Sequence, residues 1–176
     1  MTRPRLLTAW LDGCSGCHMS LLDIDERLID LAARAEVVMS PLIDVKEIPE
    51  GIDVAIVEGA VGNVADLEKI RAIRQRTKIL VSLGDCAVTA NVPAMRNPIG
   101  VAPVMRRVYL ESGDLNPQQP TGAPALLPQA RPIHEYVPVD LFVPGCPPSA
   151  DTIWHVLSEL LAGRMPDLSE MTRFGA

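Results

Sequence analysis

Short apolar runs alternate with amphipathic stretches along most of this 176-residue chain. Five runs are rich in Val, Ile and Leu, which is the composition of buried β-strands. They lie at about 5–11, 37–39, 53–58, 78–83 and 139–143. Three of the intervening stretches, about 20–32, 64–76 and 151–161, place apolar residues three and four apart, as amphipathic helices do. In the first of these, Ser20 and Asp23 have the spacing of a capping box, so we expect that helix to begin near Ser20.

This alternation of strands and helices is typical of a parallel sheet with right-handed crossovers. We therefore expect an α/β fold of the flavodoxin-like, doubly wound type. Its five parallel strands are predicted to lie in the order 2-1-3-4-5.

The stretch 93–138 breaks the pattern. Twelve of the sixteen prolines lie between Pro93 and Pro148. We expect a Pro-rich, irregular insertion with one short helix near 104–111, ordered by packing around a site or a partner. Since the chain has no low-complexity linker, we expect one domain over 1–176.

Composition and charge narrow the functional classes. The net charge is −6 and no Lys/Arg cluster is present, which argues against nucleic-acid binding. Neither an export signal nor an apolar stretch long enough for a bilayer is visible, so we expect a cytoplasmic protein without membrane insertion. Hydrophobic residues make up 48% of the chain. That fraction indicates either surface buried against another subunit or strands covered on both faces.

Each of the four cysteines closely follows a predicted strand. Cys14 and Cys17 follow the first, Cys86 the fourth and Cys146 the fifth. Because parallel strands end at one edge of the sheet, three loops would bring the thiols together. Structural disulfides are rare in the cytoplasm, so convergent thiols favour a metal or iron–sulfur site. Glycines that let the backbone approach the sulfurs flank these thiols: Gly13, Gly16, Gly84 and Gly145.

Other interpretations of the cysteines have to be weighed. The segment CSGCH at 14–18 matches a c-type haem attachment motif, and its CxxC pair resembles a thioredoxin site. Both leave Cys86 and Cys146 unexplained. Structural zinc usually takes two CxxC knuckles, whereas these two cysteines are isolated. They could also be small buried residues, but their Gly-containing loops argue against that. Spacing favours a four-cysteine metal centre and does not separate a 2Fe–2S from a 4Fe–4S cluster.

Four motifs in order resemble those of nickel–iron hydrogenase small subunits. They are LDGCSGCH at 11–18, VEG at 57–59, GDCA at 84–87 and VPGCPP at 143–148. The resemblance extends over about 5–164. A related family, the cluster-bearing subunit of respiratory complex I, often has adjacent cysteines in the first motif. The spaced pair of this chain favours hydrogenase. With no cysteines for further clusters, the chain resembles the short, cytoplasmic type found in NAD-reducing hydrogenases.

This resemblance implies that Cys14, Cys17, Cys86 and Cys146 bind one 4Fe–4S cluster. The cluster would pass electrons from a nickel–iron site in a separate large subunit to iron–sulfur and flavin diaphorase subunits that reduce NAD. NADP or a deazaflavin as acceptor stays open. The chain itself would carry no catalytic residue and no hydrogen-activating metal. The alternatives are a complex I-type quinone oxidoreductase subunit and a thioredoxin-like thiol oxidoreductase.

Five further residues are expected to support the cluster from nearby. They are Gly13, Glu58, Gly84, Gly145 and Pro147. Pro147 stands directly after Cys146, as in many cluster motifs. Glu58 ends a predicted strand at the same edge. It could hydrogen-bond to amides of the cysteine loop or assist a proton path, or it could simply cap a loop and face solvent.

Overall fold

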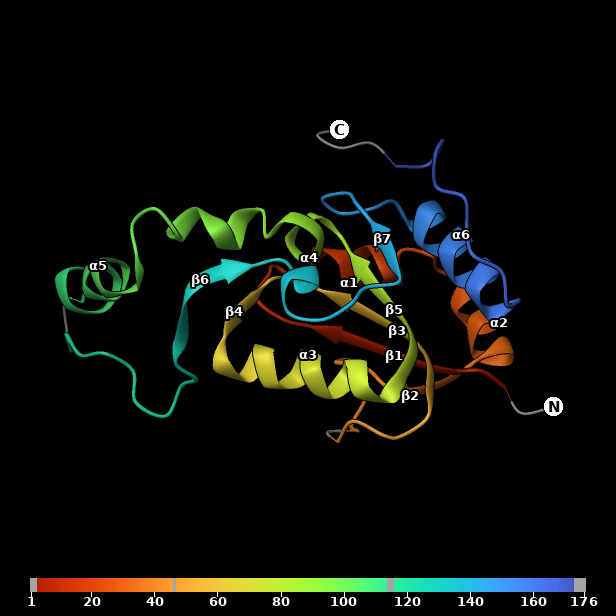
Figure 1. Ribbon diagram of the computed structural model, residues 1–176, viewed down its shortest axis with the longest axis horizontal. Helices are drawn as coiled ribbons and strands as arrows, with labels where there is room; N and C mark the ends of the chain where they lie inside the picture. The colour runs from red at the N-terminus through yellow and green to blue at the C-terminus, as the bar shows by residue number, and fades with distance from the viewer. Residues whose placement is uncertain (1–2, 46, 114–115, 173–176) are drawn as a thin grey trace.

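The computed structural model describes residues 3–45, 47–113 and 116–172. Within them, a five-stranded parallel sheet has the order β2-β1-β3-β5-β7 (Figure 1). Its strands are β1 (Arg5–Trp10), β2 (Glu36–Met39), β3 (Ile52–Glu58), β5 (Thr77–Leu83) and β7 (Leu141–Val143). They correspond to the five apolar runs of the sequence, and the predicted α/β class is confirmed.

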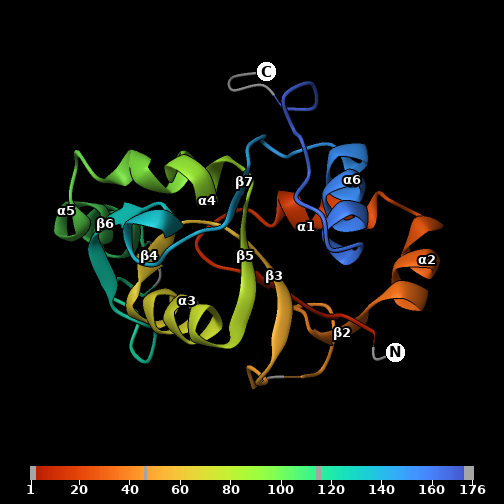
Figure 2. The ribbon, with the colours of Figure 1, turned by 45° about the vertical axis from the view of Figure 1, so that its right-hand side comes forward.

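Helices cover both faces of the sheet (Figures 1 and 2). One face packs against α1 (Gly16–Leu22), α2 (Arg27–Arg34) and α6 (Ala150–Leu161). The other packs against α3 (Val64–Arg76), α4 (Asp85–Thr89) and the short helix η3 (Ile133–Glu135). The central strands β1, β3 and β5 are therefore buried on both sides, which accounts for part of the high apolar content of the chain.

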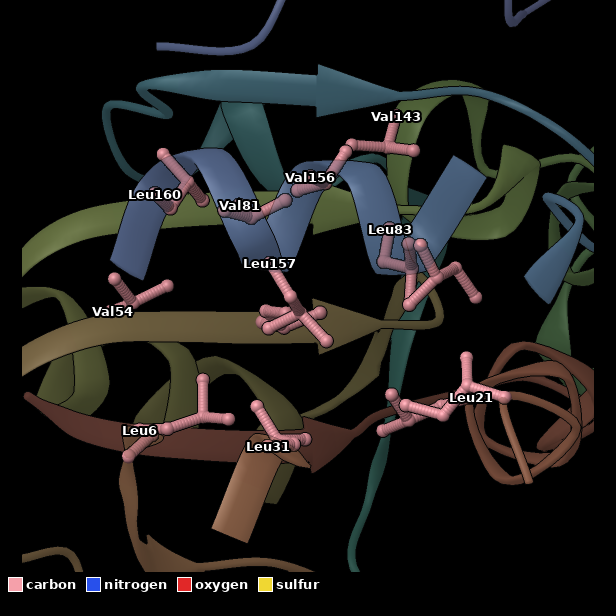
Figure 3. Packing of buried hydrophobic residues seen from close by; sticks show 14 residues of the cluster. Leu6, Leu21, Leu31, Val54, Val81, Leu83, Val143, Val156, Leu157 and Leu160 are labelled. Carbon is pink, nitrogen blue, oxygen red and sulfur yellow. The ribbon is translucent and has the colours of Figure 1, made fainter. Parts of the chain in front are cut away.

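Alternating residues of the strands divide between two cores. Leu6 of β1 and Val54 of β3 point toward Leu157 of α6 in the first core (Figure 3). Their neighbours Leu7 and Ala55 belong to the second core, on the side of α3. This period of two is what a central strand requires when helices lie above and below it.

The stretch 93–138 is more regular than the sequence predicted. It includes most of η1 (Val92–Arg96), all of α5 (Val101–Arg106) and η2 (Arg107–Glu111), and the strand β6 (Leu126–Arg131). Strand β6 pairs antiparallel with β4 (Val61–Asn63), and the sequence predicted neither strand. Strand β4 has three residues, and β6 carries Pro128, which normally argues against a strand but is tolerated at a sheet edge.

The first helix also differs from its prediction. It begins at Gly16, so Cys17 lies in its first turn, and it ends at Leu22. The capping box at Ser20 was wrong. Ser20 lies within α1 and not at its start, and its buried hydroxyl donates a hydrogen bond of 2.6 Å to the Pro148 carbonyl. The chain then turns through Asp25, at a φ of +52°, before α2 begins.

A bilayer-spanning helix is not found among the described residues, because none of their helices combines sufficient length with sufficient apolar character.

Candidate iron–sulfur site

The four thiols gather at the carboxyl edge of the sheet. Cys14 lies in the loop after β1 and Cys17 in the first turn of α1. Cys86 lies in the first turn of α4, after β5, and Cys146 in the loop after β7. All four are free thiols; Cys14 and Cys146 are exposed, and Cys17 and Cys86 are half-buried. Three loops therefore deliver the cysteines to one region, as the sequence predicted.

A cavity of about 190 Å³ lies between these loops. That is far more than the roughly 10–15 Å³ needed to hold one water molecule. Its lining is mostly apolar apart from the thiols and one carboxyl group, and consists of Asp12, Gly13, Cys14, Cys86, Val92, Pro93 and Cys146. Within the described residues, no three His, Cys, Asp or Glu side chains have the geometry of a single-ion site.

Cys17 is the most enclosed of the thiols. Burial raises the pKa of its thiol well above the ordinary range, and the Glu58 carboxylate, Cys86 and Cys14 raise it further. Burial likewise raises the pKa of Cys86. Both groups therefore hold their protons at neutral pH unless a cation stabilises the thiolate. Bound metal supplies that stabilisation and displaces the proton, so this donor set fits a metal centre.

Hydrogen bonds lock the second and third cysteine loops together. The Asp85 carboxylate accepts from the Gly145 amide at 2.7 Å, and the Asp85 amide donates to the Gly145 carbonyl at 2.8 Å. The Gly84 amide donates to the Val143 carbonyl at 2.8 Å. The bond from Ser20 to Pro148 then ties α1 to the third loop. These contacts fix where Cys86 and Cys146 leave the backbone.

The predicted supporting glycines lie where backbone or sulfur comes close. A Cβ on Gly84 would overlap the Cys17 sulfur, and one on Gly145 would lie 2.7 Å from the backbone nitrogen of Pro148. Gly13 lines the cavity, and a Cβ there would lie 3.3 Å from the Gly59 Cα. Pro147 stands between Cys146 and Pro148 in the third loop.

Glu58 is buried at the end of β3, with 3% of its surface exposed. One of its carboxylate oxygens accepts a hydrogen bond of 3.0 Å from the His18 amide. The other lies 3.2 Å from His18 Nδ1 without hydrogen-bond geometry. The His18 ring is buried and packs edge-on against Trp10, with 5.4 Å between the ring centroids. Glu58 therefore does not face solvent at the end of its strand. Its carboxylate instead fixes the backbone of His18, the residue after Cys17.

Two contacts of the site were missed in the sequence. The Asn91 side-chain amide donates to the Cys146 sulfur at 3.7 Å. Asp85 joins the loops of Cys86 and Cys146. It belongs to the GDCA motif, but no role was predicted for it. The motif could have pointed to Asp85. No local pattern distinguishes Asn91, because its contact depends on the turn after α4.

Comparison with known proteins decides the family. The model of the family described as NADH ubiquinone oxidoreductase, 20 Kd subunit, matches residues 14–160. The chain belongs to this family. It is also 38% identical to the NAD-reducing hydrogenase HoxS subunit delta of Cupriavidus necator, over 97% of this chain and 85% of the relative. The motif resemblance to hydrogenase small subunits and to their complex I relatives is thus confirmed.

Other members of this hydrogenase group are longer. A subunit of the F420-non-reducing hydrogenase vhu of Methanocaldococcus jannaschii is 38% identical over 90% of this chain, which spans only 56% of that relative. A relative from Archaeoglobus profundus, 30% identical over 88% of the chain, is named an iron-sulfur subunit of an F420-non-reducing hydrogenase. This name and the family assignment both point to iron–sulfur binding.

Solved structures give the same result. A chain of the NAD+-reducing [NiFe]-hydrogenase in the H2-reduced state superposes with a TM-score of 0.92 at 40% identity. The match covers 98% of this chain and 99% of that one. The [NiFeSe]-hydrogenase of Dm. baculatum matches with a TM-score of 0.60 at 17% identity, which shows a shared fold.

Proposed function

We propose that this chain is the electron-transfer small subunit of a cytoplasmic nickel–iron hydrogenase, linked to NAD reduction. Cys14, Cys17, Cys86 and Cys146 hold one 4Fe–4S cluster. The observation that carries the proposal is the gathering of four free thiols from three loops at one edge of the sheet, where three of them line one cavity. One relative matched over 97% of this chain and one solved chain matched over 98% of it belong to NAD-reducing hydrogenases, which supports the assignment.

Several features favour a cluster over a single zinc ion. Zinc in a structural site needs all four sulfurs ~2.3 Å from one point. Here three cysteines line a cavity of about 190 Å³, and Cys17 lies beside it against Gly84. Thiols spread around a space suit a group of several iron atoms. When bound, such a cluster supplies one-electron storage between a donor and an acceptor.

The residues of this chain position the ligands and adjust their electron density. Glu58 fixes the His18 amide, and with it the start of α1 that carries Cys17. Asp85 sets the distance between the loops of Cys86 and Cys146. Asn91 directs an N–H group at the Cys146 sulfur, and such bonds favour the reduced, more negative state of a cluster. Hydrogen itself is split on the large subunit.

Hydrogen oxidation there feeds electrons to the cluster, and the acceptor is the iron–sulfur and flavin module of the diaphorase subunits. The near alternative is a subunit of a complex I-type quinone oxidoreductase, because the family model carries that description. Nickel in the purified complex separates the two. A thiol oxidoreductase of the thioredoxin kind would use only two of the four thiols and bind no iron.

The direct test is anaerobic purification of the complex, followed by iron, sulfide and nickel quantitation and electron paramagnetic resonance. We expect four irons on this chain and nickel in its partner. Each single Cys→Ala variant should lose or convert the cluster, whereas Met19→Ala, an exposed neighbour on α1, should keep it. A Cys→Ala variant with four irons and an unchanged spectrum would remove that ligand from the proposal. A complex without nickel would favour the quinone oxidoreductase.

A further inference from the structure

One helical segment projects away from the sheet (Figure 1). It is formed by α5 and η2 and returns to β6 through residues 116–125 (Figure 1). We call residues 101–125, other than 114 and 115, the arm. Neither α5 nor η2 has a single buried residue. In a globular domain a helix is normally stabilised by packing one face on a core, so this segment lacks its usual support.

The arm exposes three large apolar side chains. Val108, Tyr109 and Leu110 are consecutive and have 52%, 38% and 39% of their surface exposed. The two arginines that precede them, Arg106 and Arg107, both form ion pairs with Glu111. Glu111 balances one of these two positive charges, so the exposed apolar side chains stand beside a residual charge of +1. Contiguous exposed apolar surface of this kind marks interaction sites.

The base of the arm is rigid. Arg96 donates to the carbonyls of Leu127 and Gly62 at 3.0 and 2.8 Å. The Asn97 side chain exchanges two hydrogen bonds of 2.8 Å with the backbone of Ala130. The matched chain of the NAD+-reducing hydrogenase covers 98% of this one, which leaves no room for omission of the arm. The arm therefore has a counterpart in that chain.

Exposed apolar residues, called the strip below, follow the chain from the cluster cavity toward the arm. Val92 lines that cavity and is 60% exposed; Met95 and Ile99, further along the chain, are 71% and 60% exposed. A protein that covers the mouth of the cavity therefore meets the strip first and the arm next. In the proposed function, the protein at the mouth is the large subunit with the nickel–iron site, because its electrons enter there.

We propose that the arm clasps the large subunit and holds it over the cluster cavity. This inference rests on the proposed function and names the partner of the arm. A second copy of this chain is a poorer occupant, since a copy seated on the strip would obstruct the cavity mouth. The diaphorase subunits are poorer occupants as well, because electrons leave toward them, whereas the strip begins at the cavity mouth where electrons enter.

The first experiment compares two charge substitutions in the full chain, each co-produced with its large subunit. Val108→Asp combined with Leu110→Asp places charges on the arm. Ile29→Asp places one on α2, at the opposite end of the molecule, where the side chain is 73% exposed (Figure 1). We expect the arm variant to keep four irons and its circular dichroism spectrum. Its affinity for the large subunit should fall roughly thirtyfold or more, as at an interface hot spot.

The control Ile29→Asp should bind the large subunit like the natural chain. Equal binding by the arm variant, or equal loss by both variants, would overturn the inference. The proposed function fails separately, if the natural chain carries no iron or recovers no large subunit.

A second experiment identifies the occupant of the arm. Tyr109 is replaced with the photo-reactive residue benzoylphenylalanine, and the assembled complex is irradiated. Cross-links to the large subunit are expected. Cross-links to a second copy of this chain, or to a diaphorase subunit, would refute the proposed contact.

Discussion

Substitution of Gly84 with Ala tests the geometry of the cluster site most sharply. Gly84 stands between β5 and α4 and has φ +81° and ψ 161°. Residues with side chains almost never adopt this combination, and forcing it costs about 1–3 kcal/mol. A Cβ at this position would also overlap the Cys17 sulfur, and it would lie 3.4 Å from the Gly145 carbonyl oxygen. The variant therefore strains the backbone and displaces a proposed ligand together.

Gly122→Ala separates these two effects. Gly122 also has a φ of +81°, but a Cβ there would meet no atom within 4 Å. It should therefore incur a backbone cost on the order of 1 kcal/mol and leave the cysteines unaffected. The difference between the two variants then reports the contact with Cys17.

Both variants are purified anaerobically, and their iron content, electron paramagnetic resonance spectrum and urea unfolding are measured. Gly122→Ala should retain four irons and unfold slightly more easily. Gly84→Ala should have fewer than four irons or an altered spectrum. Four irons and an unchanged spectrum in Gly84→Ala would refute the reasoning, because Cys17 could not then bind iron from its described position.

Three further predictions concern tuning, pH and packing. Asn91→Ala should lower the reduction potential of the cluster by roughly 40 mV in a redox titration, because a hydrogen bond of ~1 kcal/mol to the Cys146 sulfur corresponds to that shift for one electron. An unchanged potential would exclude the contact between Asn91 and Cys146. Hydrogen bonds from Lys78 and from the Arg5 amide lower the pKa of Asp53 below its ordinary 3.8. Because the ion pair is partly exposed, it adds less than about 1 kcal/mol to the free energy of unfolding above that pH, and this stability is lost as the pH falls through the lowered pKa. Urea unfolding should show Asp53→Asn less stable than the natural chain at pH 7, but not at low pH, whereas the exposed Asp44→Asn should match the natural chain throughout. Ile70→Ala, at a fully buried position of α3, should lower the free energy of unfolding by about 2–5 kcal/mol, and a loss below 1 kcal/mol would mean that the second core is loosely packed.

The sequence was most informative where local pattern and tertiary role agree. The helix 64–76 was predicted at its observed bounds, since Ile70 and Ile73 face the core and Asn63 caps its first turn. The apolar runs of β1, β3 and β5 could be read directly because helices cover both faces of each strand. Their carboxyl ends then indicated where the cysteines meet.

The sequence was least informative where distant segments stabilise a short element. Strand β4 forms because β6, more than sixty residues later in the chain, pairs with it. Neither strand has the run of apolar residues that marks the central strands. Ser20 has the spacing of a helix cap but is used by a loop 128 residues away. Asn91 reaches the Cys146 sulfur only after the turn that follows α4. Each of these depends on three-dimensional proximity, which periodicity does not encode.

The bonds of Asp85 with Gly145 and of Ser20 with Pro148 involve no sulfur atom. The scaffold around the site is therefore held by bonds that do not use the proposed cluster ligands. We expect these loops to keep their arrangement when the cluster is removed. Over evolutionary time, the same separation would let the first loop change its cysteine pattern while the other two loops stay in place.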